Sequence, residues 1–94
     1  MKKDKNKLEL KEYLIDYDMF NLEEIVKIIS FFELIEKVNK GKKYKKEEVI
    51  NKYNEYRSIL NNKSLEKKYD AMLLKMTGAS IYHTMKDLMK NETR

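Results

Sequence analysis

The segment from Leu22 to Val38 constrains the fold of this chain more than any other feature. Its sequence, LEEIVKIISFFELIEKV, has apolar side chains at more than half of its positions, and the polar ones recur along one narrow stripe. This spacing predicts an α-helix with an unusually wide apolar face. Such a face must be covered on more than one side. We therefore expect the central helix of a small helical domain, or, as the alternative, a helix whose face partly serves for docking.

Few residues interrupt the periodic pattern, because the chain has no proline and only two glycines. Asn21 and Glu24 have the spacing of a capping box at the start of the first helix. Gly41 is suited to end that helix, since glycine adopts the left-handed conformation without steric cost. A second helix is predicted over residues 45–60, where apolar side chains recur at intervals of three and four.

Two further helices are predicted in the C-terminal third of the chain. Ser64 is expected to cap the third helix and Gly78 to end it, after which Ser80 caps the fourth. Four helices joined by short connections predict an all-α fold, a small antiparallel four-helix bundle. The stretch MTGASIYHT around Gly78 is then mainly the corner between two helices.

The N-terminal part of the chain lacks a helical pattern. Residues 1–12 are mostly charged and are expected to be a mobile terminus, and residues 13–20 are expected to form an extended arm that packs on the bundle. With 94 residues in all, the chain has room for one domain, which we place at residues 13–92. We expect a cytoplasmic protein, because no apolar targeting segment or membrane span is evident.

Composition excludes several kinds of site. The chain has no cysteine, which excludes disulfides and thiolate zinc sites. The net charge of +5 comes almost wholly from lysine, since Arg57 and Arg94 are the only arginines. Sites that read phosphates or bases favour arginine, whose planar group bonds bidentately. The net charge is therefore only weak support for nucleic-acid binding.

Charge is unevenly distributed along the chain. Residues 37–46 contain six lysines and no acidic residue, whereas residues 12–36 are strongly acidic. A bundle with these segments at opposite ends is polarised along its length. The lysine-rich loop 37–46 is a candidate contact for nucleic acid, an anionic surface or an acidic partner, through Lys42, Lys43, Lys45 and Lys46.

Several short motifs, taken in their order along the chain, resemble the YktA-like uncharacterised protein family of low-GC Gram-positive bacteria (UPF 0223 group). The motifs are Tyr13-Leu-Ile-Asp16, the segment from Leu22 to Val38, Tyr53 with Tyr56, Lys63-Ser-x-Glu66-Lys67, and Gly78-Ala-Ser80-Ile-Tyr82. The family typically has a Tyr-Pro pair where this chain has Tyr13-Leu14, which leaves the path of the arm open. The resemblance implies a small, soluble helical domain of the bacterial cytoplasm and implies no activity.

The residues give little support to catalysis or to a cofactor. His83 is the only histidine, and no carboxylate precedes it by three residues, so the carboxylate-and-histidine pattern of di-iron bundles is absent. Ser80 lies one turn before His83 without an evident orienting acid. The start of the fourth helix can instead attract an anion through its backbone N–H groups, with Ser80 and His83 nearby. We expect no catalytic residue, no metal and no cofactor.

The side chains of the last three helices cover the first helix only narrowly, which leaves two interpretations of their aromatic and methionine residues: all of them fill the core, or part of them stays exposed for a partner. We expect some of them to form an interaction surface: Tyr53, Tyr56, Met72, Met76, Met85 and Met89. The function we expect is a non-enzymatic protein-interaction or accessory module, with an unidentified protein partner or a second copy of the chain. The alternative is a weak binder of nucleic acid or anions through the lysine-rich loop.

Overall fold

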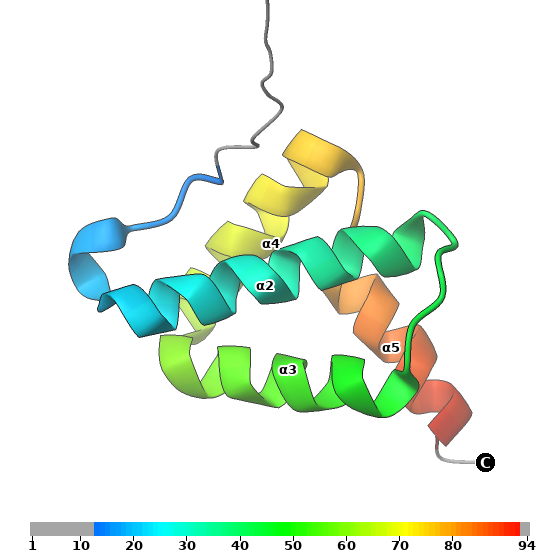
Figure 1. Cartoon of the computed structure of the whole chain (residues 1–94). Coiled ribbons are helices and arrows are strands. Elements are labelled where there is room, and N and C mark those ends of the chain that lie inside the picture. The colour runs from blue at the N-terminus through cyan, green and yellow to red at the C-terminus, as the bar shows by residue number, and fades with distance from the viewer. Residues whose placement is uncertain (1–12, 93–94) are drawn as a thin grey trace, which may run out of the picture.

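The computed structural model describes residues 13–92. In this part of the chain a short 3-10 helix is followed by four α-helices: η1 (Tyr17–Met19), α2 (Leu22–Asn39), α3 (Lys46–Leu60), α4 (Lys63–Thr77) and α5 (Ile81–Glu92) (Figure 1). The described residues contain no strand. The protein is an all-α four-helix bundle, as predicted from the sequence. The predicted mobile terminus, residues 1–12, lies outside the described residues.

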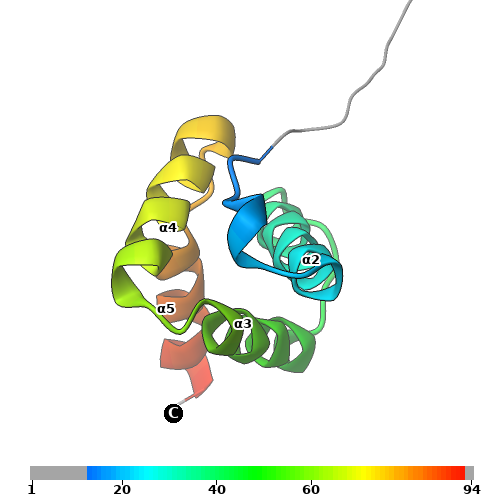
Figure 2. The same cartoon turned by 90° about the vertical axis from the view of Figure 1, so that its left-hand side faces the viewer.

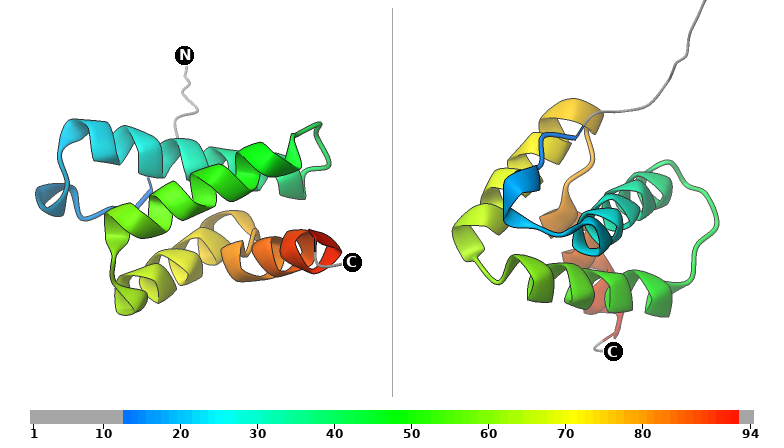
Figure 3. Two further views of the ribbon diagram at one scale, coloured as in Figure 1. Left: turned by 90° about the horizontal axis from the view of Figure 1, so that it is seen from below. Right: turned by 60° about the vertical axis from the view of Figure 1, so that its left-hand side comes forward.

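The four helices follow one another around a ring. α2 and α3 lie side by side and antiparallel, whereas α4 and α5 are steeply inclined to each other, since α4 rises and α5 descends toward the right of Figure 1 (Figures 1 and 3). Each helix contacts the next one in the chain, and α5 returns to contact α2. Seen from the end, the arm enters between α2 and α4 (Figure 2). The arm therefore fills the space between α2 and α4, which do not follow each other in the ring.

Local hydrogen bonds explain where α2 begins and ends. The Asn21 side chain accepts from the Glu24 N–H at 2.8 Å, and the Glu24 carboxylate accepts from the Asn21 N–H at 3.0 Å, which completes the predicted capping box. Lys40 follows the last turn, and Gly41 has a φ of +77°. The predicted bounds of this helix are confirmed.

The start of α4 differs from the prediction that Ser64 would cap it. Asn61 adopts a left-handed conformation with φ +46°, which reverses the chain directly after α3. Asn62 is then extended, and its side-chain oxygen accepts from the Leu65 N–H at 2.9 Å. Ser64 is already inside the helix. Both asparagines suit such positions, so the sequence carried a signal that the choice of Ser64 overlooked.

An aromatic cluster forms the centre of the core. Phe31 and Phe32 of α2 are fully buried, and the ring of Tyr56 stacks on Phe31 with centroids 4.5 Å apart. Phe32 meets Tyr56, Tyr69 and Tyr13 edge to face at 5.7, 6.1 and 5.1 Å. Such pairs stabilise a core beyond the area that they bury. Since these rings come from α2, α3, α4 and the arm, the middle of α2 is the centre of the domain, as predicted.

The arm is only partly extended. Tyr13 and Ile15 are buried in the core, which confirms that the arm packs on the bundle. Beyond Asp16, however, the chain folds into η1 before α2 begins. The prediction of an extended arm is therefore wrong for residues 17–19. The Met19 N–H donates to the Asp16 carbonyl oxygen at 2.9 Å, which closes this turn.

Candidate functional site

The lysine-rich loop joins α2 to α3 at the end of the pair opposite the arm (Figure 1). Lys42, Lys43 and Lys45 are exposed, whereas Lys46 is half-buried in the first turn of α3. The 18 residues of α2 separate this loop from the acidic start of the helix by about 27 Å, at 1.5 Å per residue. The structure thus places the lysine-rich loop and the acidic start of α2 at opposite ends of the α2–α3 pair.

The corner before α5 does not offer the free donors that suggested an anion site. The carboxylate of Asp70, on α4, accepts from the backbone N–H groups of Ile81 at 2.9 Å and Tyr82 at 3.3 Å. The Ser80 hydroxyl accepts from the His83 N–H at 3.2 Å, which confirms Ser80 as a cap. The first turn of α5 is therefore already neutralised by a carboxylate of the same chain. His83 is exposed beside this corner.

The predicted aromatic and methionine surface does not exist as one surface. Tyr56 and Met85 are each 2% exposed and belong to the core, so their assignment to an interaction surface is wrong. Both side chains belong to the buried core cluster, and the Tyr56 ring stacks on Phe31 of α2. Of the other four, Tyr53, Met72 and Met89 are half-buried against the core and only Met76 is exposed.

Exposed apolar side chains gather instead in the arm, η1 and the first turns of α2. Nine large apolar side chains are exposed among the described residues, and five of them come from residues 14–26. We call these five the apolar strip: Leu14, Tyr17, Met19, Leu22 and Val26. Their segment contains no lysine or arginine. Sequence periodicity assigned Leu22 and Val26 to the broad face of α2, but nothing local indicated that the bundle would leave them uncovered.

A groove runs between α3, α4 and the start of α5. Its volume is about 280 Å³, just below the usual range for ligand sites. We call it the aromatic groove, and it is lined by Tyr53, Tyr56, Arg57, Lys63, Lys67 and Tyr82, together with Glu66, Asp70 and Ile81. The resemblance pointed to several of these positions, but their assembly from three helices was not predicted.

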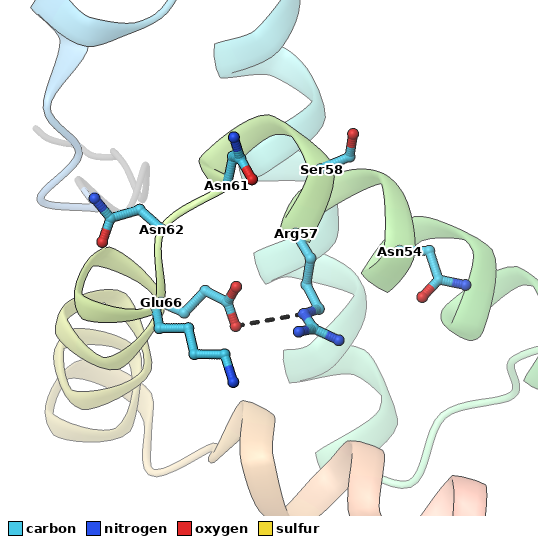
Figure 4. A pocket seen from close by; sticks show the side chains of 7 residues that line it. Asn54, Arg57, Ser58, Asn61, Asn62 and Glu66 are labelled. Atoms are coloured by element: carbon cyan, nitrogen blue, oxygen red, sulfur yellow. Dashed lines mark ion pairs between the residues drawn. The ribbon is translucent and has the colours of Figure 1, made fainter.

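A polar cavity of about 410 Å³ adjoins the aromatic groove at the α3–α4 turn. Its lining includes Asn54, Ser58, Asn61 and Asn62, and it shares Arg57, Lys63 and Glu66 with the groove (Figure 4). Figure 4 shows Arg57 of α3 and Glu66 of α4 pointing toward each other, with an N–O distance of 3.4 Å. The same guanidinium lies 5.4 Å from the centre of the Tyr53 ring. Arg57 is thereby held at the boundary between the two cavities.

The hydroxyl group of Tyr56 is an exception among the buried polar groups. Tyr56 lines the aromatic groove, and its hydroxyl oxygen is shielded from solvent and has no hydrogen-bond partner among the described residues. Burial, followed by the negative charges of Glu66 and Asp70, raises the pKa of this phenol well above its usual range. The hydroxyl therefore stays protonated at neutral pH and can act as a donor. A buried polar group without a partner is uncommon in folded proteins.

Neither a metal site nor a membrane span is found in the described part of the chain. Nowhere in residues 13–92 do three or more carboxylate or imidazole groups gather as a metal ion requires. None of the helices formed by these residues has the length and apolarity needed to cross a bilayer.

Comparison with known proteins decides the family. The model of an uncharacterised protein family, UPF0223, matches residues 11–94. The chain belongs to this family. The UPF0223 protein of Bacillus cytotoxicus is 37% identical to it over 74 residues, which cover 79% of this chain and 81% of that protein. The UPF0223 protein of Oceanobacillus iheyensis is 35% identical over 75 residues, which cover 80% and 83%. No solved structure matches the chain significantly.

Membership of UPF0223 confirms the resemblance inferred from the ordered motifs. The match includes every motif on which that inference rested, from Tyr13 to Tyr82. The family carries no assigned activity in its description. Membership of the family therefore assigns no chemistry to this UPF0223 protein.

Proposed function

We propose that this UPF0223 protein is a non-enzymatic protein-interaction module and that the apolar strip is its docking surface. The observation that carries the proposal is the exposure of Leu22 and Val26, at 77% and 54%. These two residues lie one turn apart on α2, and the chain enters α2 from η1, whose Tyr17 and Met19 are also exposed. Contiguous exposed apolar side chains are typical of surfaces that bind other proteins.

The charges around the apolar strip indicate the kind of partner. Asp18 and Glu23 are exposed within it, and its segment contributes no basic residue. The adjacent Lys27 is engaged with Glu55 at 3.1 Å and with Glu23 at 3.8 Å. A complementary surface presents apolar side chains flanked by lysine or arginine. We infer that the partner is a protein with a basic, amphipathic segment.

A symmetric dimer of this chain is a poorer occupant of the strip. A two-fold interface brings the same patch of both copies together, so Asp18 and Glu23 of one copy would lie against an equally acidic patch of the other. Like charges placed against each other across an interface cost several kcal/mol. The lysine-rich loop of a second copy has the complementary charge, but that contact would be head to tail. Self-association is therefore an outcome that the experiment must distinguish.

The proposal that the protein is not an enzyme is supported by the roles of Ser80 and His83. The Ser80 hydroxyl serves as a helix cap, and the contact between the two residues runs through the backbone N–H of His83 rather than its imidazole ring. We also infer a cytoplasmic location, in keeping with a chain without cysteine. Fractionation of the cells of origin with an antibody to the chain tests the location directly.

The docking surface is tested with a double variant, Leu22→Ser with Val26→Ser. The bait protein is immobilised and exposed to native cell extract, and the captured proteins are compared with those held by a matched control. Leu74→Ser with Met76→Ser is the control, because it removes exposed apolar side chains from α4 instead. We expect a captured protein that the wild type and control retain, that the strip variant loses, and that elevated salt releases.

Sedimentation across a wide range of concentration distinguishes a partner from a second copy. We expect the purified wild type to remain monomeric. Association that grows with concentration and disappears in the strip variant would replace the basic partner by a second copy. A monomer whose captured proteins do not depend on Leu22 and Val26 would contradict the proposal as a whole.

A further inference from the structure

The aromatic groove has the lining of a binding site that is separate from the apolar strip. It lies on α3, α4 and the start of α5, whereas the strip lies on the arm, η1 and α2. We propose that the groove binds a small ligand that joins a phosphate to a flat ring, as a nucleoside monophosphate does.

The Tyr56 hydroxyl is the first observation that points to a ligand. Tyr56 is 2% exposed, lines the groove, and leaves its hydroxyl without a partner among the described residues. Folding has removed this donor from water without providing an acceptor. The oxygen has almost no exposed surface in the free protein, so an acceptor in the groove reaches it only after neighbouring side chains move aside, and the hydrogen bond it then gains displaces no other. A phosphate oxygen is a strong acceptor of this kind, because it is charged.

The charges of the groove favour an anion once the internal pairs are accounted for. Glu66 is paired with Arg57, and Asp70 is bound to the N-terminal backbone of α5. Lys63 and Lys67 remain, both exposed at the groove, and neither is paired with a carboxylate among residues 13–92. Two lysines beside neutralised acids give the groove a positive potential that suits a phosphate.

The flat part of the ligand is inferred from the rings in the lining. Tyr53 and Tyr82 come from α3 and α5, and both line the groove. Tyr82 is 60% exposed, with the Lys86 ammonium 5.7 Å from its ring centre, while Arg57 covers part of Tyr53. Exposed tyrosine rings next to cationic side chains are suited to stack on a base. A volume of about 280 Å³ limits the ligand to a small molecule.

Binding is measured by NMR, with the ¹⁵N-labelled protein titrated separately with adenosine monophosphate, adenosine and inorganic phosphate at constant ionic strength. We expect adenosine monophosphate to shift the amide signals of residues 53–67 and 81–82. Adenosine and phosphate should each bind about tenfold more weakly or worse, because each supplies half of the contacts. If phosphate binds as tightly as the nucleotide, the proposed stacking of a flat ring is wrong. If adenosine binds as tightly as the nucleotide, the proposed phosphate contact is wrong.

Two sets of variants assign the contacts. Lys63→Gln with Lys67→Gln should weaken nucleotide binding about tenfold or more, since it removes both unpaired cations. Lys52→Gln with Lys75→Gln is the control with the same change of charge, at lysines of α3 and α4 that do not line the groove, and should bind as the wild type does. Equal losses in the two double variants would show non-specific attraction and overturn the site.

Tyr56→Phe separates a role in binding from a role in folding. If the hydroxyl is idle in the free protein, the substitution leaves the urea midpoint unchanged or raises it, while nucleotide affinity falls about tenfold. A lower midpoint with unchanged affinity would show that the hydroxyl serves the fold. Absence of any shift in the wild type at millimolar nucleotide would also overturn the proposal.

Discussion

The Tyr13 hydroxyl donates a hydrogen bond to the Glu36 carboxylate, and the two residues are 23 positions apart in the chain. Both side chains are buried, at 5% and 7% exposure. The bond fixes the arm to the last turn of α2, and the Tyr13 ring also contacts that of Phe32, one turn earlier on the same helix. Burial, reinforced by this bond and by the charge of Glu36, raises the pKa of Tyr13 well above its usual range. Tyr13 thus remains a donor throughout the range in which proteins are normally handled.

Tyr13→Phe should destabilise the fold, because it leaves a buried carboxylate with one donor fewer. We expect a loss of about 1–3 kcal/mol in the free energy of unfolding, measured by urea denaturation at neutral pH. Tyr17→Phe is the control, since the Tyr17 hydroxyl donates to the Tyr13 carbonyl oxygen at 3.3 Å on a half-exposed ring. That control should change stability by less than about 0.5 kcal/mol. Equal effects would mean that the bond to Glu36 contributes nothing specific.

Asp16 should make the attachment of the arm to α4 sensitive to acid. Its carboxylate accepts from the Tyr69 hydroxyl at 2.9 Å and from the Lys68 ammonium at 3.1 Å, and these bonds hold the pKa of Asp16 below its ordinary value. A lowered pKa in the folded state stabilises the fold above the unfolded pKa of about 3.9, and this stabilisation is lost as the pH falls further.

The measurement for Asp16 is the urea midpoint as a function of pH. Asp16→Asn should lower the midpoint near neutral pH and bring it closer to the wild-type value in acid, where the wild type has lost the same charge. The exposed Asp18→Asn is the control and should leave the shape of the profile unchanged. Parallel profiles for the wild type and Asp16→Asn would refute the role assigned to this carboxylate.

Asp70 should stabilise the start of α5 from a different helix. Because its carboxylate accepts from the N–H groups of Ile81 and Tyr82, Asp70→Ala should cost about 0.5–2 kcal/mol, the range found for helix caps. Asp70→Asn keeps one acceptor oxygen and should cost less. Hydrogen exchange should locate the loss in the first turn of α5. Unchanged protection of these amides in Asp70→Ala would show that the cap is dispensable.

Gly78→Ala should be destabilising through backbone conformation alone. Gly78 has a φ of +82°, and an added Cβ would meet no atom within 4 Å, so steric contact does not contribute. The expected cost is about 1–2 kcal/mol, from the denaturant midpoint. Asn61→Gly tests the same principle with the opposite sign, because Asn61 has a φ of +46°. It should be neutral or slightly stabilising. An unchanged midpoint for Gly78→Ala would refute the conformation.

The lysine-rich loop should bind nucleic acid only in the non-specific range. We expect dissociation constants no tighter than about 10⁻⁴ to 10⁻⁶ M at physiological salt, with log affinity falling linearly with log salt. Replacing Lys42, Lys43, Lys45 and Lys46 by glutamine should abolish this binding in a mobility-shift titration. Submicromolar binding that depends on the nucleic-acid sequence would make nucleic acid the main partner of the protein.

The sequence by itself determined the helices, because their signals are local. The capping box at Asn21, the glycines at positions 41 and 78, and the Ser80 cap each act within a few residues, and all were found where expected. The apolar periodicity of α2 likewise identified the central helix, since its width does not depend on what covers it. At the start of α4, Asn62 and Ser64 are both residue types that cap helices. The sequence alone therefore did not decide between them, and the structure shows that Asn62 is the cap.

Only the tertiary structure decided which surfaces remain and what each polar group meets. Tyr56 and Met85 have the same helical spacing as the side chains around them, and their burial follows from where α2 lies. Asp70 reaches α5, and Tyr13 reaches Glu36, through contacts that span 11 and 23 residues of the chain. The exposure of the apolar strip and the unpartnered hydroxyl of Tyr56 arise in the same way. Periodicity records which face of a helix is apolar, but burial depends on helices that are distant in sequence and meet only in the folded chain.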